Sequence, residues 1–151
     1  MTLSINDLAP NFTLPTDNRG TTTLSDWIGK NVIVYFYPKD ATSGCTKEAC
    51  SFRDNKPKFD KLNTIIIGIS KDSVKSHDKF KEKEKLNFIL ASDESGEVCE
   101  KYGTWVEKSM YGRKYFGIER STFLINEDGK IAKIWRKVSV SDHIEDILKS
   151  L

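Results

Sequence analysis

An unbroken apolar and aromatic run at residues 32–37, closed by Pro38, limits the possible folds more than any other segment. A strand with one face in water alternates polar and apolar residues, so this run predicts a strand buried on both faces. Residues 65–70, Ile-Ile-Ile-Gly-Ile-Ser, predict a second strand of the same kind. A sheet buried on both faces needs helices to cover it, and the chain is therefore expected to adopt an α/β fold.

The other segments fit this interpretation. In the first part of the chain, we expect short strands at 12–14 and 21–24 around a turn at 16–20, a helix that follows the capping cluster 41–44, and a helix over 73–85. Further along, we expect a strand over 88–90, a helix over 94–102, a strand over 121–125, a hairpin turn at 126–129 before a strand over 130–135, and a terminal helix from 141. We expect Pro57 to end or kink the first helix. The order predicts one domain, residues 1–151, in which helices cover a mixed central sheet.

Composition excludes several classes of protein. The 24 Lys and Arg residues nearly balance 22 Asp and Glu residues, which gives a net charge of +2 and does not indicate a nucleic-acid binder. The mixed charges at 79–85 are typical of a solvated helix face. The apolar runs are far shorter than the roughly 20 residues that span a bilayer, and residues 1–7 do not resemble a signal peptide. With three cysteines, the chain is expected to be cytoplasmic, with no membrane partner.

Cys45 is the first candidate for chemistry. It follows a buried strand and a capping turn, and so falls in the first turn of a predicted helix. The unpaired N–H groups and the positive dipole end at that position favour a thiolate, which is the reactive form of cysteine. A lone free cysteine is more often a small buried hydrophobic residue, but a second cysteine, Cys50, in the same helix favours a chemical role.

Two other uses of cysteine fit poorly. Cys45 and Cys50 are not at the spacing of a zinc knuckle, and neither His77 nor His143 follows at a ligand spacing, so no metal or other cofactor is expected. A disulfide oxidoreductase of the thioredoxin type would have Cys-x-x-Cys at the helix start, and that motif is absent. We assign no role to either histidine.

Pro38, Thr42 and Cys45 form a Pro-x-x-x-Thr-x-x-Cys pattern that resembles the signature of the peroxiredoxins. The wider likeness is to the bacterioferritin-comigratory, or Q-type, subfamily, and it covers nearly the whole chain. The similar segments are 9–12, 24–27, 35–40, 44–46, 48–50, 68–72, 90–93 and 117–125. The resemblance implies a thioredoxin-like fold with an added amino-terminal hairpin.

The resemblance also implies roles for individual residues. Cys45 corresponds to the peroxidatic cysteine, Thr42 to the hydroxyl that orients the peroxide, Pro38 to a residue that shields the thiolate, Arg120 to the activating guanidinium, and Glu48 to an acidic residue that positions the arginine. A fixed cation favours the thiolate and stabilises charge on the leaving oxygen as the O–O bond breaks. Ser43 stands where the subfamily usually has proline, and we expect a looser pocket or a shifted helix start there.

The resemblance further implies that Cys50 resolves the oxidised Cys45 as an intrachain disulfide. On an intact helix, five residues advance about 500° and about 7.5 Å, which puts the two Cα atoms roughly 8.7 Å apart. A disulfide needs no more than about 7 Å, so the helix must first unwind locally. Cys99 is expected to be structural, although it stays an alternative resolving thiol.

We therefore expect a thiol peroxidase that reduces hydrogen peroxide and organic hydroperoxides and receives electrons from a thioredoxin-like dithiol protein. The chain is expected to be a monomer. Two alternatives stay open: a non-catalytic thioredoxin-fold binding module, and a dithiol–disulfide exchanger that would reduce insulin without peroxide.

Overall fold

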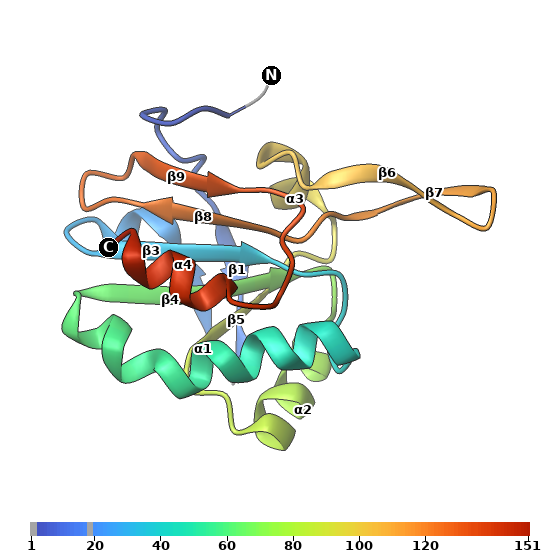
Figure 1. The fold of residues 1–151 in the computed structure, drawn as a ribbon, viewed down its shortest axis with the longest axis horizontal. Coiled ribbons are helices and arrows are strands. Elements are labelled where there is room, and N and C mark those ends of the chain that lie inside the picture. Colours follow the sequence, from blue (N-terminus) through green and yellow to red (C-terminus); the bar gives the residue numbers. More distant parts are fainter. Residues whose placement is uncertain (1–2, 18–19) are drawn as a thin grey trace.

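The computed structural model describes residues 3–17 and 20–151. Its centre is a five-stranded mixed sheet in the order β5-β4-β3-β8-β9 (Figure 1). The bounds of these strands are β3 Asn31–Phe36, β4 Thr64–Ser70, β5 Ile89–Ser92, β8 Ser121–Ile125 and β9 Ile131–Trp135. β3, β4 and β5 run parallel to one another, whereas β8 pairs antiparallel with β3 and with β9. The apolar run at 32–37 thus lies in the middle strand of the sheet and the residue after it, and its side chains are almost completely buried, as expected for a strand covered on both faces.

Helices and a small hairpin cover the two faces of the sheet. One face packs against α1 (Ser43–Lys61), α2 (Val74–Glu84) and α4 (His143–Lys149). The other face packs against α3 (Glu97–Lys101), the 3-10 helix η2 (Leu24–Trp27) and the hairpin of β1 (Thr13–Pro15) with β2 (Thr21–Thr23). This is the thioredoxin-like arrangement with an amino-terminal hairpin that the sequence predicts. Residues 18 and 19 of the predicted turn lie outside the described residues.

A close approach between the two central strands needs a glycine. Tyr35 of β3 and Gly68 of β4 are register partners, and a Cβ at Gly68 would lie 2.8 Å from the Tyr35 ring. The Tyr35 ring stacks on Phe52 of α1 with ring centroids 4.5 Å apart. A glycine here therefore lets an aromatic side chain lie across the neighbouring strand and reach the helix above it.

Several boundaries differ from the sequence prediction. The strand predicted at 88–90 is shifted toward residue 92, and the helix predicted over 94–102 is shorter at both ends. The helix over 73–85 is as predicted, with the Ser73 hydroxyl accepting the N–H of Ser76 and Lys85 ending it in a left-handed conformation. Such end effects depend on local caps rather than on hydrophobic periodicity.

Of the two alternatives expected for Pro57, an end of α1 is wrong, because the helix continues to Lys61, and a kink stays a prediction. Proline lacks the N–H that would bond to the carbonyl four residues earlier, which is that of Arg53. The Asn87 side chain donates to this carbonyl instead, at 3.3 Å. A long-range contact thus satisfies the group that the proline leaves unpaired.

The sequence interpretation missed one element entirely. β6 (Trp105–Met110) and β7 (Arg113–Ile118) form an antiparallel hairpin that projects away from the central sheet (Figure 1). Its two-residue turn, Tyr111 and Gly112, has positive φ at both positions. That geometry usually carries Asn-Gly or Asp-Gly, so a Tyr-Gly pair gives little turn signal in the sequence.

Candidate active site

Cys45 lies at the amino-terminal end of α1, beyond the end of β3, as predicted. It is the third residue of the helix, and its side chain is 2% exposed. The first N–H groups of a helix have no partners within the helix, and together with the positive end of the helix dipole they stabilise an anion at the helix start. The local backbone therefore favours a negatively charged sulfur at this position.

Arg120 reaches Cys45 from a distant part of the sequence. Phe36, the last residue of β3, pairs with Ser121, the first residue of β8, so Arg120 lies beside the exit of β3. Its Nη2 lies 3.2 Å from Cys45 Sγ. A Cβ at Gly44 would come 3.3 Å from the same nitrogen, so the glycine leaves room for the guanidinium. Sheet register and a missing side chain together bring a fixed cation to the thiol.

Glu48 holds the other side of the guanidinium. It lies three residues after Cys45, on the same face of α1, and its Oε1 accepts a hydrogen bond from Arg120 Nη1 at 2.7 Å. The side chain is fully buried, and Oε2 has no hydrogen-bond partner among residues 3–17 and 20–151. Burial raises the pKa of Glu48 to about 7, against the lowering effect of Arg120. Burial lowers the pKa of Arg120, but Glu48 and Cys45 outweigh it and raise that pKa, so the guanidinium stays charged.

Pro38 and Thr42 belong to the loop between β3 and α1, and both are exposed. Thr42 is the residue immediately before α1, and its hydroxyl donates to the Lys39 carbonyl at 2.9 Å and accepts no N–H of the helix. Cys45 lies within one helical turn of Thr42. The proposed roles of Pro38 and Thr42 toward peroxide stay predictions.

Cys50 is half-buried on α1 and faces α2. Its Sγ lies 3.8 Å from Glu84 Oε1 at the end of α2. Burial and the Glu84 carboxylate raise the pKa of the Cys50 thiol, partly offset by Arg53. All three cysteines are reduced in this structure. While α1 is intact, Cys50 is held as a thiol against a different element from the one that contacts Cys45.

Cys99 lies on α3, in the core on the opposite face of the sheet from Cys45. It is completely buried. Burial and the neighbouring carboxylate of Asp93 raise the pKa of its thiol strongly. A buried, protonated thiol on the far side of the sheet supports the interpretation of Cys99 as a structural residue.

The sequence interpretation missed a second cation near the site. Lys108 of β6 donates from Nζ to the carbonyl of Ile118, two residues before Arg120. Burial, and then repulsion from Arg120, lowers the pKa of Lys108. No motif marks this lysine, because the hairpin that carries it was not predicted.

Both histidines have partners that the sequence did not reveal. His143 Nε2 lies 2.8 Å from the Thr122 hydroxyl, and burial lowers the pKa of His143 to about 4.

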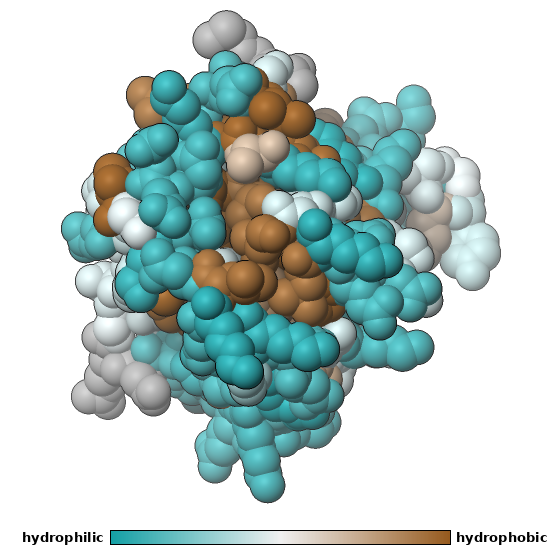
Figure 2. Space-filling view, turned by 60° about the vertical axis from the view of Figure 1, so that its left-hand side comes forward, coloured by the Kyte–Doolittle hydropathy of each residue, from teal (hydrophilic) through white to brown (hydrophobic). Residues whose placement is uncertain are grey.

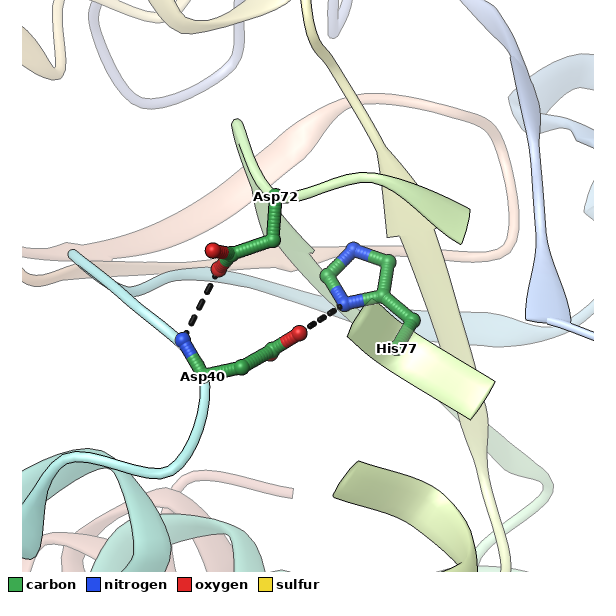
Figure 3. Close-up of side chains that lie close together, drawn as sticks. All are labelled: Asp40, Asp72 and His77. Atoms are coloured by element: carbon green, nitrogen blue, oxygen red, sulfur yellow. Dashed lines mark hydrogen bonds and ion pairs between the residues drawn. The ribbon is translucent and has the colours of Figure 1, made fainter. Parts of the chain in front are cut away.

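His77 Nδ1 lies 2.8 Å from Asp40 Oδ2. With Asp72, these two residues place ligand atoms within 4.8 Å of one another, as a metal site would (Figure 3). However, the side chains of Asp40 and His77 already contact each other, and Asp72 accepts the backbone N–H of Asp40. These polar groups therefore satisfy one another without a metal ion.

The molecule also has an apolar hollow, which lies away from Cys45. Figure 2 shows a band of hydrophobic side chains down the middle of one face, bordered by hydrophilic residues. A mostly apolar hollow of about 220 Å³ is lined by Leu24, Trp27, Val32 and Ile125 among others. Val32 is near the start of β3, whereas Cys45 follows the end of that strand, so this hollow is at the other end of the sheet from the thiol. None of the helices in the described part of the chain is long and apolar enough to cross a membrane.

A thioredoxin-like fold that buries a cysteine at a helix amino terminus against an arginine defines the class of the peroxiredoxins, which are thiol peroxidases. The family model described as "AhpC/TSA family" matches residues 5–134. Peroxiredoxin Bcp of Bacillus subtilis is 48% identical over 151 residues, which is 100% of this chain and 96% of that protein. Peroxiredoxin Bcp of Escherichia coli is 44% identical over 149 residues, 99% of this chain and 96% of that protein.

Solved structures of peroxiredoxins are also similar to this chain. A cysteine-to-serine mutant of PrxQ from Xylella fastidiosa superposes with a TM-score of 0.93 at 38% identity, over 99% of this chain and 95% of that one. Bacterioferritin Comigratory Protein of Xanthomonas campestris superposes with a TM-score of 0.88 at 42% identity, over 92% of this chain and 88% of that one. The chain therefore belongs to the AhpC/TSA family and, within it, to the Bcp/PrxQ peroxiredoxins. It is an enzyme that reduces peroxides with a thiol, as the sequence predicts.

Proposed function

We propose that Cys45 is the peroxidatic cysteine and that the chain reduces hydrogen peroxide and small organic hydroperoxides. The observation that carries the proposal is the contact of 3.2 Å between Arg120 Nη2 and Cys45 Sγ. The Xanthomonas campestris relative, which has alkyl peroxide reduction activity, supports the substrate class.

The first step forms one bond and breaks one. The Cys45 thiolate attacks the outer oxygen of ROOH, the O–O bond breaks, and the sulfur becomes a sulfenic acid while RO⁻ takes a proton and leaves as an alcohol or water. Arg120 stabilises the thiolate and then the charge on the leaving oxygen, and Glu48 holds the guanidinium in place. Thr42 orients the peroxide, and Pro38 shields the sulfur.

The second step uses Cys50. Its sulfur attacks the sulfenic sulfur of Cys45, water leaves, and an intrachain disulfide forms. A thioredoxin-like dithiol protein then reduces this disulfide by thiol–disulfide exchange and becomes oxidised itself. Cysteine-to-serine mutants at two positions of Xanthomonas campestris Peroxiredoxin Q support a mechanism with two cysteines. Those two positions lie 36 residues apart, whereas Cys45 and Cys50 are five apart, so the assignment of Cys50 rests on the sequence resemblance and not on these mutants. Electrons therefore pass from the dithiol protein to the peroxide through the two sulfurs, with no cofactor.

The test measures peroxide consumption with a dithiol reductant. Cys45→Ser is expected to abolish it, whereas Cys99→Ser, the matched control, is expected to leave it unchanged. Full consumption by Cys45→Ser would contradict the proposal and favour the binding module, and insulin reduction without peroxide would favour a disulfide exchanger.

The disulfide has its own test. After one equivalent of peroxide, peptide mapping by mass spectrometry under non-reducing conditions is expected to give a Cys45–Cys50 peptide. A dominant Cys45–Cys99 peptide, or an intermolecular bond between two Cys45 residues, would overturn the role of Cys50 and leave that of Cys45 intact.

A further inference from the structure

A buried network holds the loop that precedes Cys45 (Figure 3). Its centre is Asp40, between β3 and α1, whose side chain is 3% exposed. Asp40 Oδ1 accepts a hydrogen bond from the Tyr37 hydroxyl at 2.6 Å. Asp40 Oδ2 accepts one from the Ser76 hydroxyl at 2.8 Å and lies 2.8 Å from His77 Nδ1. Two residues of α2 thus bind the carboxylate of a loop residue.

His77 is held at both of its ring nitrogens. The ring is completely buried, with Asp40 Oδ2 2.8 Å from Nδ1 and the Ala91 carbonyl 3.0 Å from Nε2. The Tyr37 hydroxyl lies 3.4 Å from the same Nδ1. From its place in α2, the ring therefore joins the carboxylate of the loop to β5, and these buried polar atoms satisfy one another.

The backbone at Asp40 is held as well. Its N–H donates to Asp72 Oδ2 at 2.8 Å, and the same oxygen accepts the Ser70 hydroxyl at 2.6 Å. Ser70 is the last residue of β4, so the support comes from the neighbouring strand of the sheet. Position 40 is thus fixed at both its main chain and its side chain.

The next residue explains why so many contacts are needed. Ala41 has φ of +63°, a left-handed conformation that is costly for a residue with a Cβ and persists only where neighbouring contacts impose it. Ala41 lies between Asp40 and Thr42, and the Thr42 hydroxyl closes the turn on the Lys39 carbonyl. The strained turn sets the position of Thr42 and of the start of α1.

We propose that His77 is a positioning residue for peroxide reduction, because its pairing with Asp40 holds the strained turn that presents Thr42 beside Cys45. The role rests on the proposed function, in which Thr42 orients the peroxide. Without the imidazole, the buried Asp40 carboxylate loses a hydrogen-bond partner, Ala41 relaxes out of the left-handed region, and Thr42 moves. The Arg120–Cys45 contact comes from another element and stays in place.

The test compares two reactions of Cys45 in a Cys50→Ser/Cys99→Ser background, in which it is the single thiol. His77→Gln is expected to slow the reaction with hydrogen peroxide roughly tenfold, the rate equivalent of left-handed strain at one residue. Alkylation by iodoacetamide, which needs the thiolate but not Thr42, is expected to change less than about twofold. His143→Gln is the matched control, because it removes a buried histidine that does not contact the loop.

A second substitution links the effect to the turn. Glycine adopts positive φ without the penalty of a Cβ, so Ala41→Gly in the His77→Gln protein is expected to recover part of the peroxide rate. Asp40→Asn weakens the same pairing from the other side. Should His77→Gln fail to fold, Asp40→Asn is expected to give the same split between the two reactions.

Three results would overturn the role of His77. They are an unchanged peroxide rate, an equal fall in both reactions, which indicates a general structural effect, and no recovery with Ala41→Gly. Cys45→Ser, measured alongside, reports on the proposed function separately: if that variant keeps full activity, the proposed function fails, and the role of His77 fails with it.

Discussion

Replacing Arg120 by methionine removes the cation while keeping much of the side-chain volume. In the folded protein the guanidinium spans Cys45 Sγ, at 3.2 Å, and Glu48 Oε1, at 2.7 Å. Its side chain is 16% exposed, so water screens these contacts only in part. The substitution therefore removes a mostly buried charge from beside the reacting sulfur and leaves the Glu48 carboxyl without its partner.

The size of the effect follows from the geometry. At a separation of 3.2 Å, two unit charges attract by about 5 kcal/mol at an effective dielectric constant of about 20. Part of that attraction exists before the transition state, and solvent replaces some of it. Loss of a single donor to a developing negative charge typically costs about 3–4 kcal/mol. We expect Arg120→Met to lower the rate constant of the peroxide reaction by roughly 10²–10³.

Stopped-flow measurement of the reduced protein with hydrogen peroxide gives this rate constant. Arg120→Lys is the control, since it keeps the charge but not the planar pair of donors, and its rate constant is expected to fall between those of the wild type and Arg120→Met. A peroxide rate of Arg120→Met within about threefold of the wild type would refute the role of Arg120.

Three further predictions follow. Cys50→Ser is expected to keep the first oxidation but to stop turnover with a dithiol protein, and intact mass after one equivalent of peroxide will show one added oxygen unless the resolving role is wrong. The pKa of Glu48 is raised from 4.5 to about 7, so the folded state binds more protons than the unfolded state between these pH values. The free energy of unfolding should therefore fall by about 3 kcal/mol as pH rises through that window. Glu48→Gln should flatten this pH dependence in urea titrations, and an unchanged slope would argue against Glu48 as its source. Gly68→Ala would place a Cβ 2.8 Å from the Tyr35 ring and should cost about 1–3 kcal/mol in urea unfolding, whereas Gly117→Ala, with its nearest contact at 3.4 Å, should cost clearly less.

The parts of the fold that follow from hydrophobic pattern were predictable. The run at 32–37 lies in the central strand because a segment that is apolar at every position must be buried on both faces. The β6–β7 hairpin was not predictable, since most of its residues are exposed and Tyr111-Gly112 does not carry the usual turn signal. Pro57 was misjudged because the residue that compensates for it, Asn87, lies thirty positions further along the chain.

The candidate site shows the same division. The resemblance named Cys45, Glu48 and Arg120, and the structure brings these three side chains together. The pairing of Asp40 with His77 joins residues 37 positions apart, and nothing in either local sequence marks it. Contacts of this kind depend on which strands are neighbours in the sheet, and a single sequence does not reveal that at the level of side chains.

The contacts of α1 also bear on how the proposed disulfide can form. The second half of the helix is tied to α2: Arg53 Nη1 donates to the Glu84 carbonyl at 2.6 Å, and the rings of Phe52 and Phe59 are buried in the core. At the other end, Ser43 is exposed, but Cys45, Glu48 and Ala49 in the first two turns are buried. Unwinding from the amino terminus as far as Cys50 therefore spares the Arg53 contact and both rings, but it exposes these three side chains and breaks the contacts of Arg120 with Cys45 and Glu48.

The loop before the helix does not share that freedom, because Asp40 is fixed by α2 and by the end of β4. The segment that can open without breaking the Arg53–Glu84 bond or the contacts of Asp40 thus lies between Asp40 and Phe52, and both Cys45 and Cys50 fall inside it. If His77 and Asp40 hold the turn as proposed, they would also limit how far the helix opens. A sulfenic acid that waits for such an opening is exposed to further oxidation, so we expect the stability of these first turns to determine how much peroxide the enzyme tolerates.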